Sequence, residues 1–183
     1  MGSVDAEGTG GTGSDDAGST SSVHGVVVRA LTREDHGWVV ATQTHTWGSV
    51  LAARSGELVD TSTLDGLVAT LEGHRAGLAL TLLRGDELEV VSISTTVPRR
   101  GIGRALMERC FDEARSLRCR RVWLVTTNDN IPAIAFYQHV GMDLRAFRRH
   151  AVTASRLLKP EIPLRNAEGL PIDHELEFEL LLQ

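Results

Sequence analysis

The segment VPRRGIGRALM, residues 97–107, holds two glycines that could let the main chain bind phosphate. Because glycine has no Cβ, the N–H groups around Gly101 and Gly103 can point into one concave surface. The residues that follow have helical periodicity, and a helix N-terminus adds partial positive charge to that surface. The pattern predicts a diphosphate site, although a glycine-rich turn without a ligand could have the same short sequence.

Two other phosphate-binding patterns fit this segment less well. A Rossmann unit needs a third glycine and all-parallel strands, whereas Ala105 and Leu106 follow here and the preceding strands look antiparallel. A Walker loop is excluded because no Gly-Lys-Ser/Thr is present. Eight of the 18 arginines fall between Arg99 and Arg121. Their guanidinium groups could bind phosphate or could form a solvated helix face.

A second group of residues follows about 30 positions later, in NDNIPAIAFYQHVGM. Its members are Asn130, Ala133, Phe136, Tyr137 and Gly141. Their spacing resembles N-x-x-A-x-x-F-Y-x-x-x-G, the second signature of the GNAT N-acetyltransferase superfamily. The segment VPRRGIGRALM resembles the first signature, Gln/Arg-x-x-Gly-x-Gly/Ala. Two signatures at this distance are more specific than either alone, and the resemblance covers residues 25–182.

The resemblance implies a single α/β domain with the GNAT fold. Such a fold has a mixed, mostly antiparallel twisted sheet flanked by helices, with a parallel strand pair that splays at the CoA site. Acetyl-CoA, the acyl donor, would lie between the strand ending near Ser94 and the strand ending near Thr127. The expected cofactor contacts are Ile93, Ser94, Arg99, Arg100, Gly101, Ile102, Gly103, Arg104, Ala105 and, for the pantetheine arm, Asn130. Pro98 stands where the family usually has Gln or Arg, so Arg99 or Arg100 would have to supply that donor.

Acyl transfer to an amine needs a proton acceptor and a proton donor. A lysine-like amine has a pKa of about 10.4, so its nucleophilic form costs roughly 4.6 kcal/mol at pH 7. Glu89 is the candidate base, because GNAT enzymes often place a glutamate on the strand that leads to the phosphate loop. It could instead be a solvent-facing acid of an alternating strand. The resemblance implies that Tyr137 protonates the leaving thiolate, while a core aromatic residue is the structural alternative.

Other polar residues carry weaker signals. His45, Trp47, Asp129 and His150 could line the acceptor side, or could be caps, core or surface residues. The two cysteines and seven scattered histidines have no HxH, HExxH or paired-cysteine spacing. We therefore expect neither a disulfide framework nor a metal site.

The chain of 183 residues has room for one ordinary domain. Residues 1–22 are rich in Gly, Ser and Asp and are expected to form a disordered tail before a GNAT domain over 23–183. The formal charge of −5 falls to about −1 without the four acids of that tail, so no nucleic-acid partner is expected. No secretory signal or long apolar run is visible, which favours a cytoplasmic protein without a membrane partner.

Hydrophobic periodicity predicts how the elements follow one another. Strands are expected at 25–30, 67–71, 77–83, 87–95, 121–127 and 144–152, and helices after Thr32, over 101–117 and after Asn130. The segment 53–66 reads as a polar surface connection and 155–171 as irregular. The acidic alternation of 174–182 is typical of a strand at a sheet edge.

The resemblance implies direct transfer of an acetyl group from acetyl-CoA to an amine in a ternary complex. A small-molecule amine is the preferred acceptor, because no added module for a protein or RNA acceptor is visible. The alternatives are transfer of another acyl group from CoA in a biosynthetic pathway and a catalytically silent CoA-binding regulatory module. The sequence leaves a homodimer open.

Overall fold

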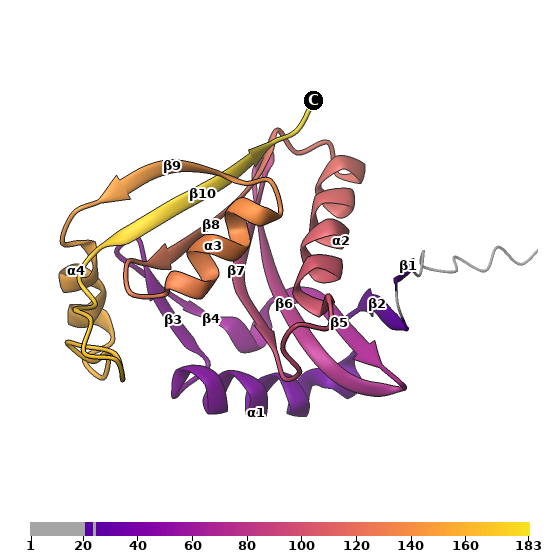
Figure 1. Ribbon diagram of the computed structural model, residues 1–183, viewed down its shortest axis with the longest axis horizontal. Helices are drawn as coiled ribbons and strands as arrows, with labels where there is room; N and C mark the ends of the chain where they lie inside the picture. The colour runs from indigo at the N-terminus through magenta and orange to yellow at the C-terminus, as the bar shows by residue number, and fades with distance from the viewer. Residues whose placement is uncertain (1–20, 24) are drawn as a thin grey trace, which may run out of the picture.

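The computed structural model describes residues 21–23 and 25–183, in which an eight-stranded sheet carries four α-helices (Figure 1). The sheet has the order β1 (Ser21–Val23), β2 (Val26–Ala30), β5 (Asp65–Leu71), β6 (His74–Arg84), β7 (Glu87–Thr95), β8 (Arg121–Thr127), β10 (Glu175–Leu181) and β9 (Asp143–Arg148). The helices are α1 (His36–Trp47), α2 (Ile102–Ser116), α3 (Ile131–His139) and α4 (Ala151–Leu158). The expected α/β fold with its mixed, mostly antiparallel sheet is confirmed.

Strands β7 and β8 are the parallel pair of this sheet among the described residues, and they separate soon after they meet. Their ladder consists of the pairs Glu87–Arg121, Leu88–Val122 and Glu89–Trp123. On its other side β7 pairs with β6, and a register shift there leaves Val91 as an extra residue. Such a bulge bends the strand locally. The sheet therefore splays between the remaining halves of β7 and β8, as expected from the sequence.

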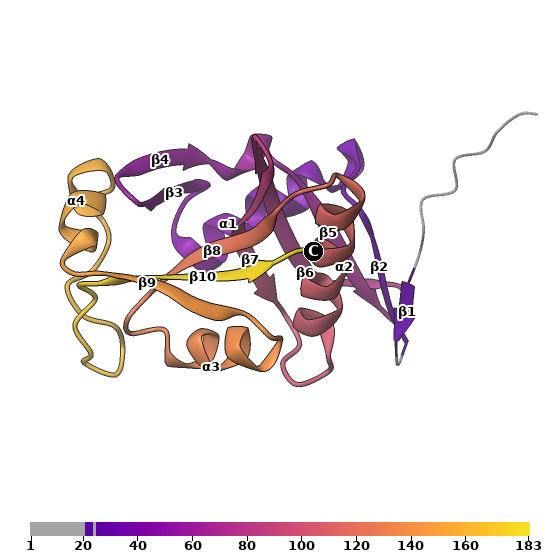
Figure 2. The ribbon, with the colours of Figure 1, turned by 90° about the horizontal axis from the view of Figure 1, so that it is seen from above.

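The two faces of the sheet carry different helices. Side chains of α2 and α3 share one core with alternate residues of β7, β8 and β10, among them Val90, Leu124 and Phe178. On the opposite face, Val39 of α1 packs on Leu78 and Leu80 of β6. Figure 2 shows α1 and α3 on opposite sides of the sheet. Strands β7 and β8 therefore separate between two layers of helices.

The start of α1 follows a short 3-10 helix, Arg33–Asp35, which is fixed by a capping box between Thr32 and Asp35. The Asp35 carboxylate is fully buried and accepts hydrogen bonds from the Thr32 N–H at 2.9 Å and hydroxyl at 3.0 Å. It also pairs with Arg29 at 2.6 Å and with Arg75 at 2.8 Å. The hydrogen bond from Arg29, above all, holds the pKa of Asp35 well below its usual range. These contacts tie the helix start to β2 and β6.

Three local predictions differ from the structure. The segment 53–66 is more than a connection, because it contains most of the hairpin of β3 (Leu51–Arg54) and β4 (Glu57–Asp60). Ser55 and Gly56 both have positive φ, which is the turn geometry that favours tight hairpins. The start of 155–171 lies in α4 rather than in irregular structure. The strand expected at 144–152 ends at Arg148, because Ala151 and Val152 begin α4.

Strand β10 is not at the sheet edge, because it lies between β8 and β9. Its acidic residues alternate because they form ion pairs inside the sheet rather than because they face water. The Arg121 guanidinium contacts Glu177 at 3.0 Å and Glu179 at 2.8 Å. Strand β9, which carries Arg148, is the edge strand at this end.

The tail predicted over residues 1–22 lies mostly outside the described residues. Residues 1–20 lie outside the described residues, whereas Ser21 and Ser22 belong to β1. None of the helices in the described part of the chain has the length and apolar character needed to cross a bilayer.

Candidate active site

The loop between β7 and α2 forms the concave main-chain surface that the two glycines predict. Gly101 is the N-cap of α2 with φ 75°, and a Cβ built there would meet nothing within 4 Å. The first main-chain hydrogen bond of the helix runs from the Ala105 N–H to the Gly101 carbonyl at 3.0 Å. The N–H groups of Ile102, Gly103 and Arg104 precede it, so they have no helical acceptor and can bind an anion.

The side chains of this loop divide into buried and solvent-facing groups. Ile102 and Ala105 are buried in the core, so only their main chain lies near the loop surface. Arg99, Arg100 and Arg104 are exposed. The Arg100 guanidinium approaches Glu72 only to 3.9 Å, which leaves it free to turn toward a phosphate.

Gly103 brings the two sequence signatures into contact. A Cβ at this position would lie 3.2 Å from Cζ and 3.4 Å from Cε2 of Phe136 on α3. This separation is tighter than an ordinary van der Waals contact, so only glycine lets the start of α2 approach the Phe136 ring this closely. The main-chain surface around Gly101 is thereby held next to the helix that carries Tyr137.

Replacement of Gly103 with valine should raise the KM for acetyl-CoA by about tenfold and change kcat by less than about threefold. The added methyl groups must displace the Phe136 ring or the first turn of α2, which disturbs the surface that would bind the diphosphate. Steady-state kinetics with varied acetyl-CoA measures this effect. Gly37→Ala is the matched control, because a Cβ at Gly37 meets nothing within 4 Å. An unchanged KM in Gly103→Val would contradict this placement of the cofactor.

Tyr137 is buried in the core that α3 forms with the sheet. Its ring centroid lies 5.6 Å from that of Phe136 and 5.6 Å from that of Phe178. Burial raises the pKa of Tyr137 to about 12, so the phenol stays protonated at neutral pH. Its hydroxyl makes no hydrogen bond to any residue within 21–23 and 25–183. The phenol is thus a proton donor without a partner in the described chain.

The other expected cofactor contacts lie along the two diverging strands. Ile93 and Ser94 pair with Ala79 and Leu78 of β6 on one side of β7, and both are partly exposed. Asn130 is the N-cap of α3, and its N–H donates to the Thr127 carbonyl at the end of β8. The structure therefore places these three residues on the walls of the gap between β7 and β8.

Glu89 lies where β7 and β8 separate, but it does not face solvent. Its side chain is 1% exposed, so the alternative of a solvent-facing acid is wrong. The Arg54 guanidinium lies 2.6 Å from one carboxylate oxygen and donates to the other at 2.7 Å. Arg84 donates to the second oxygen at 2.8 Å. The candidate base is therefore already ion-paired to Arg54 through both oxygens, and one oxygen accepts hydrogen bonds from both Arg54 and Arg84.

Sequence reasoning missed the buried polar groups that share this face of the sheet with Glu89. Gln43 of α1 donates to Ser92 of β7 at 2.9 Å, and both are buried. Glu175 of β10 accepts from the Ser55 N–H at 3.0 Å and from the Ser155 hydroxyl at 3.0 Å. These bonds join α1, the β3–β4 hairpin and α4 to the sheet. The polar residues alternating along 174–182 were the only local signal for them.

Two of the buried donors that have no acceptor among residues 21–23 and 25–183 belong to residues that contact or pair with Glu89. They are Nε of Arg54 and the indole Nε1 of Trp123, which pairs across from Glu89 in the parallel ladder. Buried donors are nearly always hydrogen-bonded, so these two could face an oxygen of a ligand or water. Two N–H groups near Glu89 are therefore available as hydrogen-bond donors, and the sequence did not predict either of them.

Of the weaker acceptor-side candidates, Asp129 lies beside Asn130 at the end of β8, whereas His45, Trp47 and His150 lie on other elements. The Asp129 carboxylate accepts from the Thr127 hydroxyl at 2.6 Å, and His45 is exposed on α1. Trp47 is 48% exposed, and its carbonyl accepts from the buried Lys159 ammonium at 3.0 Å. His150 lies beyond the end of β9, where it contacts Asp173.

Comparisons with known proteins agree with this arrangement. Residues 30–142 match the model of the acetyltransferase (GNAT) family. The uncharacterized protein YdhI of Bacillus subtilis (strain 168) is 37% identical over 133 residues, which cover 72% of this chain and 83% of that protein. The [ribosomal protein bS18]-alanine N-acetyltransferase of Escherichia coli (strain K12) is 31% identical over 83 residues, 44% of this chain and 56% of that enzyme.

A solved structure has a similar fold. The Bacillus subtilis acetyltransferase in complex with CoA superposes with a TM-score of 0.60 at 15% identity. The match covers 86% of this chain and 98% of that one.

Proposed function

The chain belongs to the acetyltransferase (GNAT) family, and we propose that it transfers the acetyl group of acetyl-CoA to an amine of a small molecule. The observation that carries this proposal is the placement of the gap between β7 and β8. The free N–H groups after Gly101 follow β7, and α3, which carries the protonated phenol of Tyr137, follows β8. Gly103 and Phe136 hold these two parts together.

In the proposed complex, the diphosphate of acetyl-CoA binds the N–H groups of 101–104, and the pantetheine arm lies in the gap near Asn130. The acceptor amine enters from the face that carries α1 and attacks the thioester carbon. A main-chain N–H near Ile93 would stabilise the negative charge that develops on the thioester oxygen. The tetrahedral intermediate then releases CoA as its thiolate, without a covalent enzyme intermediate.

Tyr137 would donate its proton to the departing thiolate. A thiol has a pKa of about 8.5 in water, so complete transfer from a phenol of pKa about 12 would be uphill by roughly 5 kcal/mol. The thiolate would form in the same apolar surroundings, which raise the pKa of the thiol as well and reduce this difference. A hydrogen bond that completes proton transfer late in the reaction fits these values.

Glu89 is proposed as the eventual acceptor of the amine proton. Its burial and its bonds to Arg54 and Arg84 argue for transfer through water rather than by direct contact with the amine. In this role the two arginines orient the carboxylate. The cytoplasmic location and the lack of a nucleic-acid partner remain predictions.

An assay of CoA release tests the proposed reaction. With acetyl-CoA and a panel of small primary amines, at least one amine should raise thiol release at least about tenfold above the rate of hydrolysis. Propionyl-CoA and succinyl-CoA serve as competing donors, and faster reaction with either would favour another acyl group. Binding of acetyl-CoA in calorimetry without release on any amine would favour the regulatory module. The absence of binding would reject both functions.

A further inference from the structure

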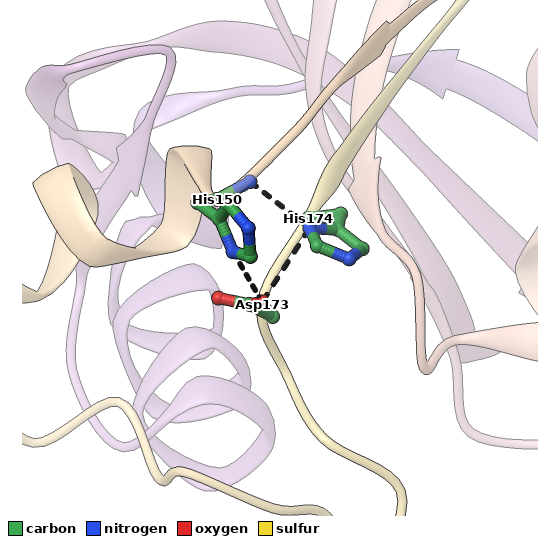
Figure 3. Close-up of side chains that lie close together, drawn as sticks. All are labelled: His150, Asp173 and His174. Carbon is green, nitrogen blue, oxygen red and sulfur yellow. Dashed lines mark hydrogen bonds and ion pairs between the residues drawn. The ribbon is translucent and has the colours of Figure 1, made fainter.

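His150, Asp173 and His174 form a cluster that the acyl-transfer chemistry does not use (Figure 3). One potential ligand atom of each residue lies within 4.8 Å of those of the others. The Asp173 Oδ2 is 2.6 Å from Nδ1 of His150 and 3.6 Å from Nδ1 of His174. The cluster joins the start of α4 to the segment that enters β10. His150 is 23 residues from Asp173 and 24 from His174, so no short motif marks the cluster.

The surrounding structure holds the main chain of Asp173 and His174 and contacts the His174 ring. The Asn128 Oδ1 accepts the N–H groups of Asp173 at 2.9 Å and of His174 at 2.8 Å. The His174 ring makes edge contacts with Phe147 and His150 at centroid distances of 5.0 and 4.9 Å. His150 has φ 57°, an uncommon value for a residue with a side chain. Such outer contacts orient ligands before a metal binds.

We propose that His150, Asp173 and His174 bind a divalent transition-metal ion, with Zn²⁺ as the preferred ion. Two imidazoles and one carboxylate are a common set of zinc ligands. Bonds of about 2.0–2.1 Å place neighbouring ligand atoms of a tetrahedral zinc site about 3.3 Å apart. The Asp173 Oδ2 lies 2.6 Å from Nδ1 of His150 and 3.6 Å from Nδ1 of His174, on either side of this value. Small side-chain rotations would therefore bring these atoms to the spacing of a zinc site. Water would take the fourth position, because all three side chains are partly exposed.

The hydrogen bonds also define the protonation needed for binding. The main-chain N–H of His150 donates to Nδ1 of His174 at 2.9 Å, so this nitrogen is unprotonated but must release that hydrogen bond to bind a metal. The Nε2 of His150 accepts from Arg149 at 3.1 Å, which places the imidazole proton on Nδ1, toward Asp173. Metal binding through Nδ1 moves that proton to Nε2, and the Arg149 side chain must then turn away.

The ion would act as a structural brace rather than in acyl transfer. In both views α4 lies at the opposite end of the molecule from α2, whose N-terminus forms the proposed diphosphate site. Helix α4 contacts β3 and β4, and β3 carries Arg54. A metal at the start of α4 would therefore fix α4, and with it the β3–β4 hairpin, to the segment that enters β10. The inference does not depend on the identity of the acceptor.

The test uses the full chain without a histidine tag. Zn²⁺ should bind at one equivalent in calorimetry and raise the melting temperature, since a ligand that binds only the folded state stabilises it. Co²⁺ should give the visible absorption of a site with nitrogen and oxygen ligands. Asp173→Asn and His150→Ala should each weaken Zn²⁺ binding by at least about 100-fold. His74→Ala, which removes an exposed histidine at the start of β6, is the matched control and should bind as the wild type does.

Three results would overturn the proposal. The first is no Zn²⁺ binding at about 100 μM, and the second is unchanged affinity in folded Asp173→Asn. Because Asn keeps the size of the side chain and the main-chain bonds to Asn128, this variant should fold, which circular dichroism checks. The third is a thiolate-to-Co²⁺ charge-transfer band, which would assign the ion to Cys110 or Cys119.

Discussion

Replacement of Tyr137 with phenylalanine is expected to lower kcat about 100-fold and to leave the KM for acetyl-CoA within about twofold. The change removes one oxygen and keeps the ring that packs between Phe136 and Phe178. A positioned acid contributes about 10²–10⁴-fold to the rate, and its loss affects the chemical step rather than substrate binding. Steady-state kinetics with both substrates varied measures the two constants separately.

The pH dependence supplies a second readout for Tyr137. Burial raises the pKa of the phenol to about 12, so its acidic form is present at every lower pH and is lost only as the pH rises through that value. The wild-type kcat should therefore not fall through phenol ionisation between pH 7 and 10. A melting temperature close to that of the wild type would verify that Tyr137→Phe is folded. Equal turnover in the two proteins would remove the proposed acid.

Replacement of Glu89 with glutamine is expected to lower the free energy of unfolding by about 3 kcal/mol. The variant leaves Arg54, which is 8% exposed, without its buried counter-charge, and breaking a buried pair typically costs 3–5 kcal/mol. We expect a value at the lower end because Glu57 still contacts both Arg54 and Arg84. Urea unfolding at pH 7 gives the difference.

Glu57→Gln is the matched control for Glu89. The Glu57 side chain is 54% exposed, and its removal should change stability by less than about 1 kcal/mol. Kinetics on the folded fraction then separates the two roles of Glu89. Loss of kcat together with a changed acidic limb of the pH profile supports proton acceptance, whereas loss of stability with unchanged kcat leaves only the structural role. Unchanged stability would contradict the ion-pair assignment itself.

The parts of the fold that could be predicted from the sequence are those whose signals are local. The apolar face of 101–117 predicts α2, and the continuous apolar run at 121–127 predicts β8. The two signatures also predict which loop and which helix approach one another, and the contact between Gly103 and Phe136 gives the physical reason. Fold and family therefore follow from short segments of the chain.

The missed features depend on contacts between distant segments. Arg54 reaches Glu89 from 35 residues away, in a segment whose polar composition resembles a surface loop. Glu175 bonds to Ser55 across 120 residues, and these bonds make an acidic strand suitable for the sheet interior. The residues next to Glu89 and Glu175 in the sequence do not predict which distant residues bond to them. The same reason explains why His150 and Asp173 were not recognised as neighbours.

The three-pair ladder between β7 and β8 has a consequence for how this molecule responds to CoA. Past Glu89, those main-chain groups of β7 that do not point toward β6 have lost a strand partner, so their amide protons should exchange readily with deuterated solvent. A pantetheine arm bound in that space would contact both strands and link the two halves of the sheet while it is bound. Protection against exchange along both edges should then rise together when the ligand is added.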